Sequence, residues 1–325
     1  MTGSTTLFDR PLPIVERFSR HISNQYEKRR QVKDERTTSS APLFVAMQGP
    51  QGCGKTTITN QLVAELEGKY GIRSCVLSMD DLYHTYANLT RVSEENPGNG
   101  LLVGRGQAGT HDLRLAEGVL KSIQSINHRA VGGGSEALAV KLPSFDKSLN
   151  SGQGDRAPTE DWKSVSPPLD LFILEGWSMG FHPLSPTRLR DVYKESEEGG
   201  TECMFLRHSL DHLQVVNRFL HEYAQILYPP FEVFLQVRPQ EMKHVYKWRL
   251  DQERAMKANN GGKGMTDEEV RRFVDRYMPG YELYLSTVRT GGPGEGGKGQ
   301  SPPWVGGGLT ILVDEERNPV EEEYW

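Results

Sequence analysis

Short apolar runs recur along the chain, and amphipathic stretches separate most of them. The runs cover residues 43–48, 74–78, 169–174, 231–237 and 309–313. Runs of this length, bounded by polar residues, are typical of buried strands rather than of helices. Their alternation with helical patterns predicts an α/β fold, with a doubly wound, mainly parallel sheet flanked by helices.

Several stretches between the runs carry the spacing of an amphipathic helix, with an apolar residue at every third or fourth position. The clearest example places Leu213, Val216 and Leu220 on one face. Another stretch opens with Thr266 followed three residues later by Glu269, which is a capping-box signature. The predicted helices cover residues 12–36, 57–67, 208–226, 242–258 and 266–285.

The chain of 325 residues is long enough to bury a sizeable core. We interpret residues 1–40 as an N-terminal helical extension and residues 41–325 as a single domain. Three glycine-rich segments interrupt this domain, at residues 130–136, 259–264 and 290–308. Because such compositions bury little apolar surface, we expect mobile surface loops there.

Charge and cysteine content narrow the class of protein. A net charge of −5 argues against a general surface for nucleic acid or anionic membrane, and no apolar run approaches the ~20 residues of a membrane span. Cys53, Cys75 and Cys203 lack the spacing of metal ligands, which favours a reducing compartment. The first forty residues lack a secretory signal, so we expect a cytoplasmic protein. The sequence does not indicate an oligomeric state.

Residues 49–56 match the phosphate-loop pattern G-x-x-x-x-G-K-[ST], between a predicted strand and a predicted helix. Glycines let backbone N–H groups close around phosphate oxygens, and the helix N-terminus adds partial positive charge. Lys55 would reach the β- and γ-phosphates, and the Thr56 hydroxyl would ligate Mg²⁺. Cys53 is either an inert loop residue or a site whose oxidation blocks the nucleotide. We predict that a nucleoside triphosphate contacts Gly49, Gln51, Gly52, Cys53, Gly54, Lys55, Thr56 and Thr57.

Two predicted strands end in acidic residues. Asp80 and Asp81 follow the strand at 74–78, and Glu175 ends a later apolar run. Ligands bind at this edge of open α/β sheets, where a kinase acting on an alcohol needs a carboxylate to orient the hydroxyl and accept its proton. Asp80 is either that base or a helix N-cap, a role that Asp81 could also fill. Glu175 is either a Mg²⁺ ligand beside Thr56 or an ordinary solvated or paired acid.

Polar blocks with flanking glycines lie between these two strands, at residues 109–112, 141–147 and 154–156. Their mixed charge suits a pocket for a small anion. In such a pocket Arg156 offers a bidentate fork, whereas Lys141 offers a point charge. The same composition is also typical of solvated loops.

Eight short blocks occur in order along the chain. They are Gly-x-x-Gly-x-Gly-Lys-Thr-Thr, Ser-Met-Asp-Asp-Leu-Tyr, Arg-Gly-x-Ala-Gly-Thr-His-Asp-Leu, Leu-Pro-x-Phe-Asp-Lys-Ser, Gly-Asp-Arg, Leu-Glu-Gly-Trp, Trp-Arg-Leu and Met-Thr-Asp-Glu-Glu-Val. This ordered set, from about residue 43 to residue 285, resembles the plant and fungal D-glycerate 3-kinases. That family is similar to the uridine kinase, pantothenate kinase and phosphoribulokinase group of P-loop kinases.

The resemblance implies a P-loop kinase fold, with a substrate-side insert at about 82–165 and a helical lid at about 239–265. It implies an enzyme that transfers the γ-phosphate of ATP, with Mg²⁺ as cofactor, to the 3-hydroxyl of D-glycerate, giving 3-phosphoglycerate. The glycine-rich segments depart from the family pattern. They leave the chemical blocks intact.

The resemblance also implies individual residue roles, with Lys55, Asp80 and Arg249 as the catalytic residues. Helical geometry favours Arg249 over Arg254 in the lid, since five residues at about 100° each separate the two side chains by about 140°. Arg254 is therefore expected at the surface, and without the resemblance Arg249 could equally be a salt-bridging surface residue. The implied metal ligands are Thr56 and Glu175, and the implied substrate-side residues are Asp80, Tyr83, Arg105, His111, Asp112, Lys141, Asp146 and Arg156.

Two other functions stay open at this point. A P-loop kinase could act on a different alcohol, such as a nucleoside or a pantothenate-like acceptor. A regulatory protein could instead bind ATP without catalysis, although a pure binder has no need of a base such as Asp80. We expect a small molecule, D-glycerate, as the partner rather than a nucleic acid or a membrane.

Overall fold

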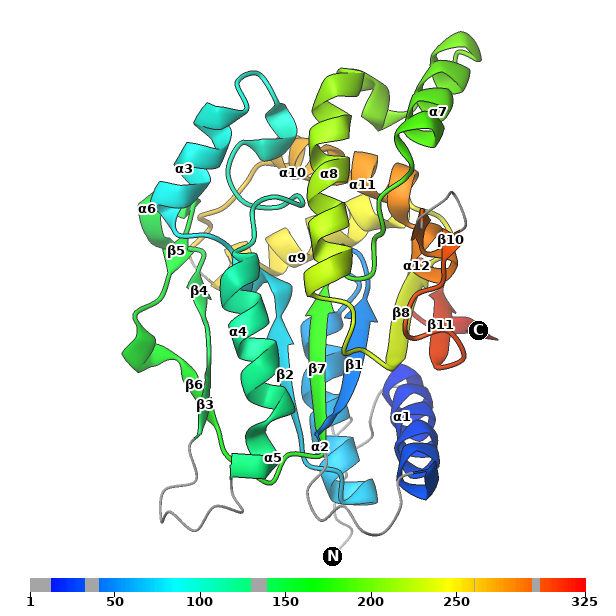
Figure 1. Cartoon of the computed structure of the whole chain (residues 1–325). Coiled ribbons are helices and arrows are strands. Elements are labelled where there is room, and N and C mark those ends of the chain that lie inside the picture. Colours follow the sequence, from blue (N-terminus) through cyan, green and yellow to red (C-terminus); the bar gives the residue numbers. More distant parts are fainter. Residues whose placement is uncertain (1–12, 33–40, 130–138, 260, 294–298) are drawn as a thin grey trace, which may run out of the picture.

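A six-stranded sheet forms the centre of the computed structural model, which describes residues 13–32, 41–129, 139–259, 261–293 and 299–325. The strand order is β12-β11-β8-β1-β7-β2, and all neighbours are parallel except β11 and β12 (Figure 1). The predicted mainly parallel α/β sheet is confirmed. Its strands are β1 (Leu43–Gln48), β2 (Ser74–Ser78), β7 (Leu171–Gly176), β8 (Val233–Pro239), β11 (Gly308–Val313) and β12 (Pro319–Tyr324).

Five of these strands lie where the apolar runs predict them, with β7 and β8 displaced by two residues toward the C-terminus. The sixth, β12, escaped prediction because Pro319–Tyr324 contains three consecutive glutamates instead of an apolar run. It forms one edge of the sheet, where proline and charged side chains are tolerated and discourage pairing with other chains.

Helices flank the sheet, and α1 packs on α2, β8 and β11. The long helices are α1 (Pro13–Val32), α2 (Lys55–Tyr70), α3 (Tyr86–Glu95), α4 (Leu113–Gln124), α7 (Pro186–Glu198), α8 (Leu210–Ile226), α9 (His244–Asn259), α10 (Asp267–Asp275) and α11 (Met278–Tyr284). Shorter ones are α5 (Ile126–Arg129), α6 (Leu149–Gly152) and α12 (Thr287–Thr290). Within the described residues, no helix has the length and apolar character needed to cross a membrane.

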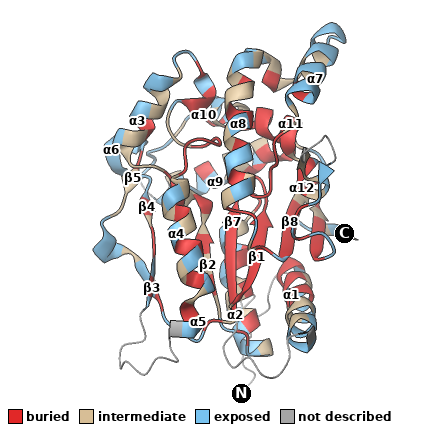
Figure 2. Cartoon of the chain, in the orientation of Figure 1, coloured by how far each residue is buried: buried red, intermediate tan, exposed pale blue. Residues whose placement is uncertain are grey.

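The core lies between the sheet and its helices, and strands β1 and β7 are buried along their whole length (Figure 2). Ile14, Val15, Phe18 and Ile22 of α1 belong to the same core. Each such side chain contributes about 1.5–3 kcal/mol relative to an exposed position. The buried centre therefore fixes the ends of β1 and β7, from which functional loops leave the sheet.

Short antiparallel ribbons decorate the sheet. Strand β3 (Val140–Leu142) pairs with β6 (Lys163–Val165), β4 (Phe145–Asp146) with β5 (Asp155–Arg156), and β9 (Gly292–Pro293) with β10 (Gly299–Gln300). The β4–β5 ribbon packs against the 3₁₀ turn Met79–Leu82 that follows β2. It thereby brings residues of the predicted substrate-side insert next to Asp80.

The single helix predicted over residues 266–285 is wrong, because two helices, α10 and α11, occupy this stretch. Pro279 lies in the first turn of α11, where it needs no backbone N–H, whereas inside a continuous helix it would remove a hydrogen bond. The capping box is confirmed, since Thr266 and Glu269 bond each other reciprocally at the start of α10.

The described parts of two glycine-rich segments are more ordered than their composition indicates. Within 290–308, the Trp304 side chain is fully buried and its indole N–H donates to the carbonyl of Val288 at 2.9 Å. In the segment 259–264, a Cβ on Gly264 would lie 2.4 Å from a carboxylate oxygen of Glu253, so this backbone also packs closely. The segment 130–136 lies outside the described residues.

Candidate active site

The site forms where three neighbouring parallel strands, β1, β7 and β2, end side by side. The phosphate loop follows β1, Glu175 and Gly176 end β7, and Asp80 lies just beyond β2. With strands about 4.8 Å apart, the loops that follow β1 and β2 begin roughly 10 Å from each other. Carboxyl ends of parallel strands are where open α/β sheets bind ligands. This spacing suits a triphosphate beside a small acceptor.

The phosphate loop has the backbone that its glycines allow. Gly52 and Gly54 adopt left-handed conformations, with φ of 75° and 93°. A Cβ on Gly52 would lie 2.7 Å from the backbone of Trp248, so this position has no room for a side chain. Lys55 opens α2, and its ammonium donates to the carbonyls of Gly49 (2.7 Å) and Pro50 (3.1 Å). The loop is therefore preformed around its own lysine.

Residues outside the motif hold this loop in place. The Arg317 guanidinium donates through Nε to the Gly52 carbonyl at 2.8 Å and lies 5.4 Å from the Trp248 ring centroid. The Tyr281 hydroxyl donates to Gln51 at 2.8 Å. Sequence reasoning missed Arg317, because it lies in the turn between β11 and β12 without any local motif.

Cys53 is buried beneath the loop, where burial raises the pKa of its thiol. A buried thiol with a raised pKa supplies little thiolate, which is the reactive form. This environment favours the inert interpretation over a redox switch.

Glu175 has the surroundings expected of a ligand for a metal ion that also binds phosphate oxygens. It is 8% exposed, and its Oε2 has no hydrogen-bond partner among the described residues. No group of three or more His, Cys, Asp or Glu side chains able to hold a metal occurs in the described part of the chain. Mg²⁺ usually binds one or two protein ligands together with substrate phosphates and water, so Glu175 and the exposed Thr56 at the start of α2 fit this ion.

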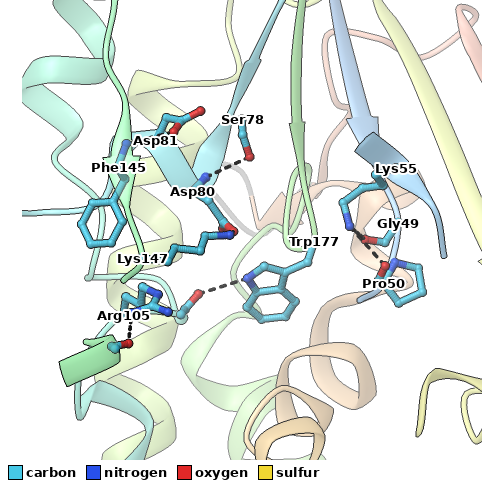
Figure 3. Close-up of polar contacts among 12 residues, drawn as sticks. Gly49, Pro50, Lys55, Ser78, Asp80, Asp81, Arg105, Phe145, Lys147 and Trp177 are labelled. Carbon is cyan, nitrogen blue, oxygen red and sulfur yellow. Dashed lines mark hydrogen bonds and ion pairs between the residues drawn. The ribbon is translucent and has the colours of Figure 1, made fainter. Parts of the chain in front are cut away.

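Asp80 lies opposite the phosphate loop and forms an ion pair that the sequence did not predict. Lys147 donates to Oδ2 of Asp80 at 2.5 Å, and the pair lies across Trp177 from Lys55 (Figure 3). Burial raises the pKa of Asp80, but the Lys147 ammonium and the Tyr83 hydroxyl act in the opposite direction and leave the pKa below its ordinary value. Asp80 is therefore a carboxylate at neutral pH.

Neither aspartate is the N-cap of the turn after β2. Ser78 caps it, since its hydroxyl accepts the N–H of Asp80 at 3.3 Å. Asp81 instead accepts the N–H of Phe145 at 3.0 Å, and burial raises its pKa to about 6. The expectation that Asp81 is a helix cap is wrong, because this carboxylate anchors the strand that precedes Lys147.

His111 lies close to Asp80 but is buried behind aromatic rings. Its ring stacks on Tyr83 with centroids 4.3 Å apart, and Nδ1 shares a 2.7 Å hydrogen bond with the Tyr223 hydroxyl. Burial lowers the pKa of His111 to about 3, so the ring is neutral. Its Nε2 has no partner among the described residues, which leaves one nitrogen for a ligand.

Asp112 and Arg156 form an internal pair. Asp112 caps α4 by accepting the N–H of Leu115 at 3.0 Å, and Arg156 donates to Asp112 and to the Tyr83 carbonyl, both at 2.9 Å. One Arg156 amino group thus serves two protein oxygens. The pair joins β5 to the start of α4, and because the buried Nε of Arg156 has no partner among the described residues, its role toward the acceptor stays a prediction.

Three other predicted substrate-side residues also point to protein atoms. Arg105 donates to the carbonyls of Gly152 and Gln153, near the Phe145 ring. Lys141 is exposed on β3 and donates to the Thr159 carbonyl at 2.8 Å, and Asp146 accepts the N–H and hydroxyl of Ser148. Among the described residues, neither Lys141 nor Asp146 forms a hydrogen bond or ion pair with Asp80, whereas Lys147 does. Lys147 belongs to the same sequence block, although the sequence analysis did not single it out, and the substrate-side role of Lys141 stays a prediction.

Trp177 is a further residue that the sequence did not single out. It follows β7, its carbonyl accepts from Gln48 of β1 at 2.8 Å, and its indole N–H donates to the Gly106 carbonyl at 3.1 Å. Trp177 therefore ties the phosphate-loop strand to the segment that carries Arg105.

The lid arginine is engaged within its own helix. Arg249 pairs with the buried Glu253 at 2.8 Å and lies 4.9 Å from the centroid of the Phe273 ring. Its charge, like that of Arg105, lowers the pKa of Tyr277, which burial raises to about 12. Arg254 forms an exposed pair with Asp267, which confirms its predicted place at the surface.

A cavity of about 810 Å³ lies elsewhere, between α9, α10 and the 3₁₀ turn Met204–Arg207. None of the predicted site residues lines it. Of its cations, Arg207 pairs with Asp275 and Lys243 with Glu241. The residues that line this cavity therefore contribute no functional group to the sheet edge that carries Asp80 and the phosphate loop.

Comparison with known proteins finds several relatives that match most of this chain. The solved structure of D-glycerate 3-kinase from Cryptococcus neoformans is 37% identical, has a TM-score of 0.85, and covers 96% of this chain and 99% of that one. The chloroplastic D-glycerate 3-kinase of Arabidopsis thaliana is 37% identical over 282 residues, 86% of this chain and 54% of that protein. The uncharacterized kinase mug58 of Schizosaccharomyces pombe is 36% identical over 285 residues, 86% of this chain and 90% of that protein.

The extent of these matches differs. The chain spans about half the length of the Arabidopsis protein but nearly all of the fungal ones. No profile of a known protein family matches it. Because identity, coverage and fold agree, the chain belongs to the D-glycerate 3-kinase family of P-loop kinases.

Proposed function

We propose that this protein transfers the γ-phosphate of ATP to the 3-hydroxyl of D-glycerate, giving 3-phosphoglycerate. The observation that carries the proposal is the placement of Asp80 and Lys147 across the end of β7 from Lys55. A base, a cation and a phosphate-binding lysine then face one small volume. The names of two relatives agree with this acceptor.

The donor half binds the triphosphate with backbone and one lysine. Amide groups of Gly49, Gln51, Gly52, Cys53, Gly54 and Thr57 and the positive end of α2 meet the phosphates. Lys55 leaves the carbonyls of Gly49 and Pro50 for the β- and γ-phosphate oxygens. Thr56 and Glu175 would hold Mg²⁺, which would neutralise charge on the transferring group.

The acceptor half prepares the hydroxyl. Asp80 is deprotonated at neutral pH, so it accepts a hydrogen bond from the 3-hydroxyl and takes its proton as the oxygen attacks phosphorus. Neutral His111 offers Nε2 to the 2-hydroxyl. Arg249, oriented by Glu253, adds positive charge beside the transferring group.

The decisive test is a direct assay of the full chain with ATP, Mg²⁺ and D-glycerate. The expected result is release of ADP together with 3-phosphoglycerate, identified by phosphorus NMR to exclude the 2-phosphate. Parallel reactions with a nucleoside and with pantothenate address the other acceptors. Absence of product from D-glycerate, together with turnover of another alcohol, would refute the proposed acceptor.

The remaining proposals concern surroundings. We infer a small-molecule partner and a cytoplasmic location, the latter supported by Cys53, Cys75 and Cys203 being free thiols. Fractionation of cells with an antibody to the chain tests the compartment. Recovery of the chain in an organelle would contradict it.

A further inference from the structure

Lys147 is the cation beside Asp80 that has no other task among the described residues. Its ammonium carries three donors, and Asp80 is its one partner in the described part of the chain. Of the other cations in the insert, Arg105 and Lys141 donate to backbone carbonyls, and Arg156 donates through one amino group to Asp112 and to the Tyr83 carbonyl. Lys147 therefore keeps donors available for a ligand.

The contact also has a chemical cost for catalysis. A carboxylate that accepts a 2.5 Å hydrogen bond from an ammonium has a lowered affinity for protons. Asp80 is thus a poor base while Lys147 holds it. The Lys147 ammonium must leave Asp80 before Asp80 can accept a proton efficiently.

The backbone around Lys147 is fixed while its side chain is free to move. Asp81 accepts the N–H of Phe145 and Asp146 accepts the N–H of Ser148, so both flanks are held. Phe145 is buried against Tyr83, with ring centroids 5.4 Å apart. The Lys147 side chain is 54% exposed and has a flexible four-carbon stem. The ammonium can therefore swing without any rearrangement of the fold.

Resting on the proposed glycerate kinase function, we propose that Lys147 binds the acceptor carboxylate and that its departure from Asp80 switches on the base. D-Glycerate has only three carbons, so its carboxylate and 3-hydroxyl lie within about 5 Å of each other, given C–C bonds of about 1.5 Å. One molecule can therefore contact Lys147 at one end and Asp80 at the other.

The acceptor carboxylate takes the Lys147 hydrogen bond, and Asp80 accepts the proton of the 3-hydroxyl. The 3-oxygen forms a bond to the γ-phosphorus as the bond from that phosphorus to the bridging oxygen breaks, and ADP leaves with the electron pair. A neutral alcohol cannot take Lys147 from Asp80, so the pair rejects acceptors that lack a carboxylate.

The first experiment compares D-glycerate with glycerol, its analogue without the carboxylate, in three forms of the full chain. Lys147→Met keeps the stem and removes the charge, and Lys147→Arg keeps a charge. Lys121→Met is the matched control, since Lys121 is an exposed lysine paired with Glu117 on α4. The measurements are kcat and KM for each acceptor and KM for ATP.

Loss of a hydrogen bond to a charged group predicts a fall of about 10- to 100-fold in kcat/KM for D-glycerate in Lys147→Met. Activity on glycerol should stay level or rise, because Asp80 is then free, and KM for ATP should hold. Lys147→Arg should keep preference for D-glycerate. An equal loss on both acceptors, or no loss on D-glycerate, would overturn the role of Lys147.

A binding measurement covers the case in which glycerol turnover is too slow to measure. In Asp80→Asn, Lys147 no longer has a carboxylate to leave, so calorimetry should show D-glycerate bound at least as tightly as in wild type. Adding Lys147→Met to that variant should abolish the gain. Weaker binding in Asp80→Asn would refute the competition between Asp80 and the acceptor for Lys147.

The two levels of proposal fail separately. Wild-type protein that does not phosphorylate D-glycerate would refute the proposed function. Wild-type protein that does so, but whose Lys147→Met variant keeps the glycerate-to-glycerol ratio, would refute only this role of Lys147.

Discussion

The donor and acceptor halves of the active site are built in opposite ways. The donor half is one continuous loop whose backbone binds phosphate, with Trp248 packed directly against Gly52. The acceptor half joins Asp80 to Lys147, which lie 67 residues apart in the chain and meet through partly exposed side chains. A packed backbone is preorganised, whereas an ion pair can exchange partners. We therefore expect rigidity on the donor side and substrate-dependent change on the acceptor side.

The largest effect should come from Asp80→Asn, which removes the base and leaves the donor half intact. Turnover of D-glycerate should fall by about 10²- to 10⁴-fold, the usual contribution of a general base. ATP affinity should be close to normal, because the phosphate loop makes no hydrogen bond to Asp80 among the described residues. Steady-state kinetics and ATP calorimetry check both halves. A loss of ATP binding as large as the loss of turnover would break the separation between them.

Rigidity of the donor half can be measured at two glycines. Gly52→Ala should lower the free energy of unfolding by about 1–2 kcal/mol through its left-handed backbone. Overpacking against Trp248 should lower it by about 1–3 kcal/mol more. Gly54 is left-handed too, but nothing lies within 4 Å of its Cβ position. Gly54→Ala should therefore lose only the stability that the left-handed backbone costs. Denaturant unfolding without nucleotide compares the two variants. Equal losses of stability would show that Trp248 yields to a side chain.

These two halves also differ in how far the sequence reveals them. The phosphate loop is read from contiguous residues, because its glycines and Lys55 act through local backbone geometry. The choice between Lys141 and Lys147 depends on how β3 and β4 leave the insert, and that is fixed by the distant partners β6 and β5. Local sequence does not reveal such pairings, so it could not show that Lys147 is the lysine that pairs with Asp80.

The same limit explains the errors in the fold. Apolar strands such as β1 can be recognised from their own sequence, whereas the glutamate-rich β12 is a strand only because it pairs with β11. Trp304 is buried despite its glycine-rich neighbours, since the cavity it fills is lined by distant residues such as Phe234 and Tyr228. Tertiary partners override local composition in both cases.

The acceptor half should also lower the stability of the folded protein at neutral pH. Asp81 allows this effect to be measured. Its pKa is raised by burial from 3.8 to about 6, so the folded protein holds a proton that the unfolded chain releases. Stability from this group is therefore present below pH 3.8 and is lost as pH rises toward 6, by at most about 3 kcal/mol. Asp81→Asn keeps an acceptor for the Phe145 N–H without the charge.

The variant should raise Tm at pH 7.5 relative to wild type, and the gain should shrink at pH 4. Thermal unfolding followed by circular dichroism at both values checks this expectation. A gain that is independent of pH would show that ionisation of Asp81 is not its source.

The smallest effect should arise from Arg317, where a side chain supports the otherwise self-sufficient donor half. Its Nε–H donates to the Gly52 carbonyl and its guanidinium lies 5.4 Å from the centroid of the Trp248 ring, so Arg317→Ala should loosen the loop and raise KM for ATP by about 3- to 10-fold, with little change in kcat. Arg317→Lys should not rescue it, because an ammonium lacks the planar fork. Arg254→Ala, which breaks only an exposed pair with Asp267, is the matched control. If Arg317→Ala changes KM for D-glycerate instead of KM for ATP, the two halves are coupled through the loop. The geometry of the acceptor half would then depend on the packing of the donor half.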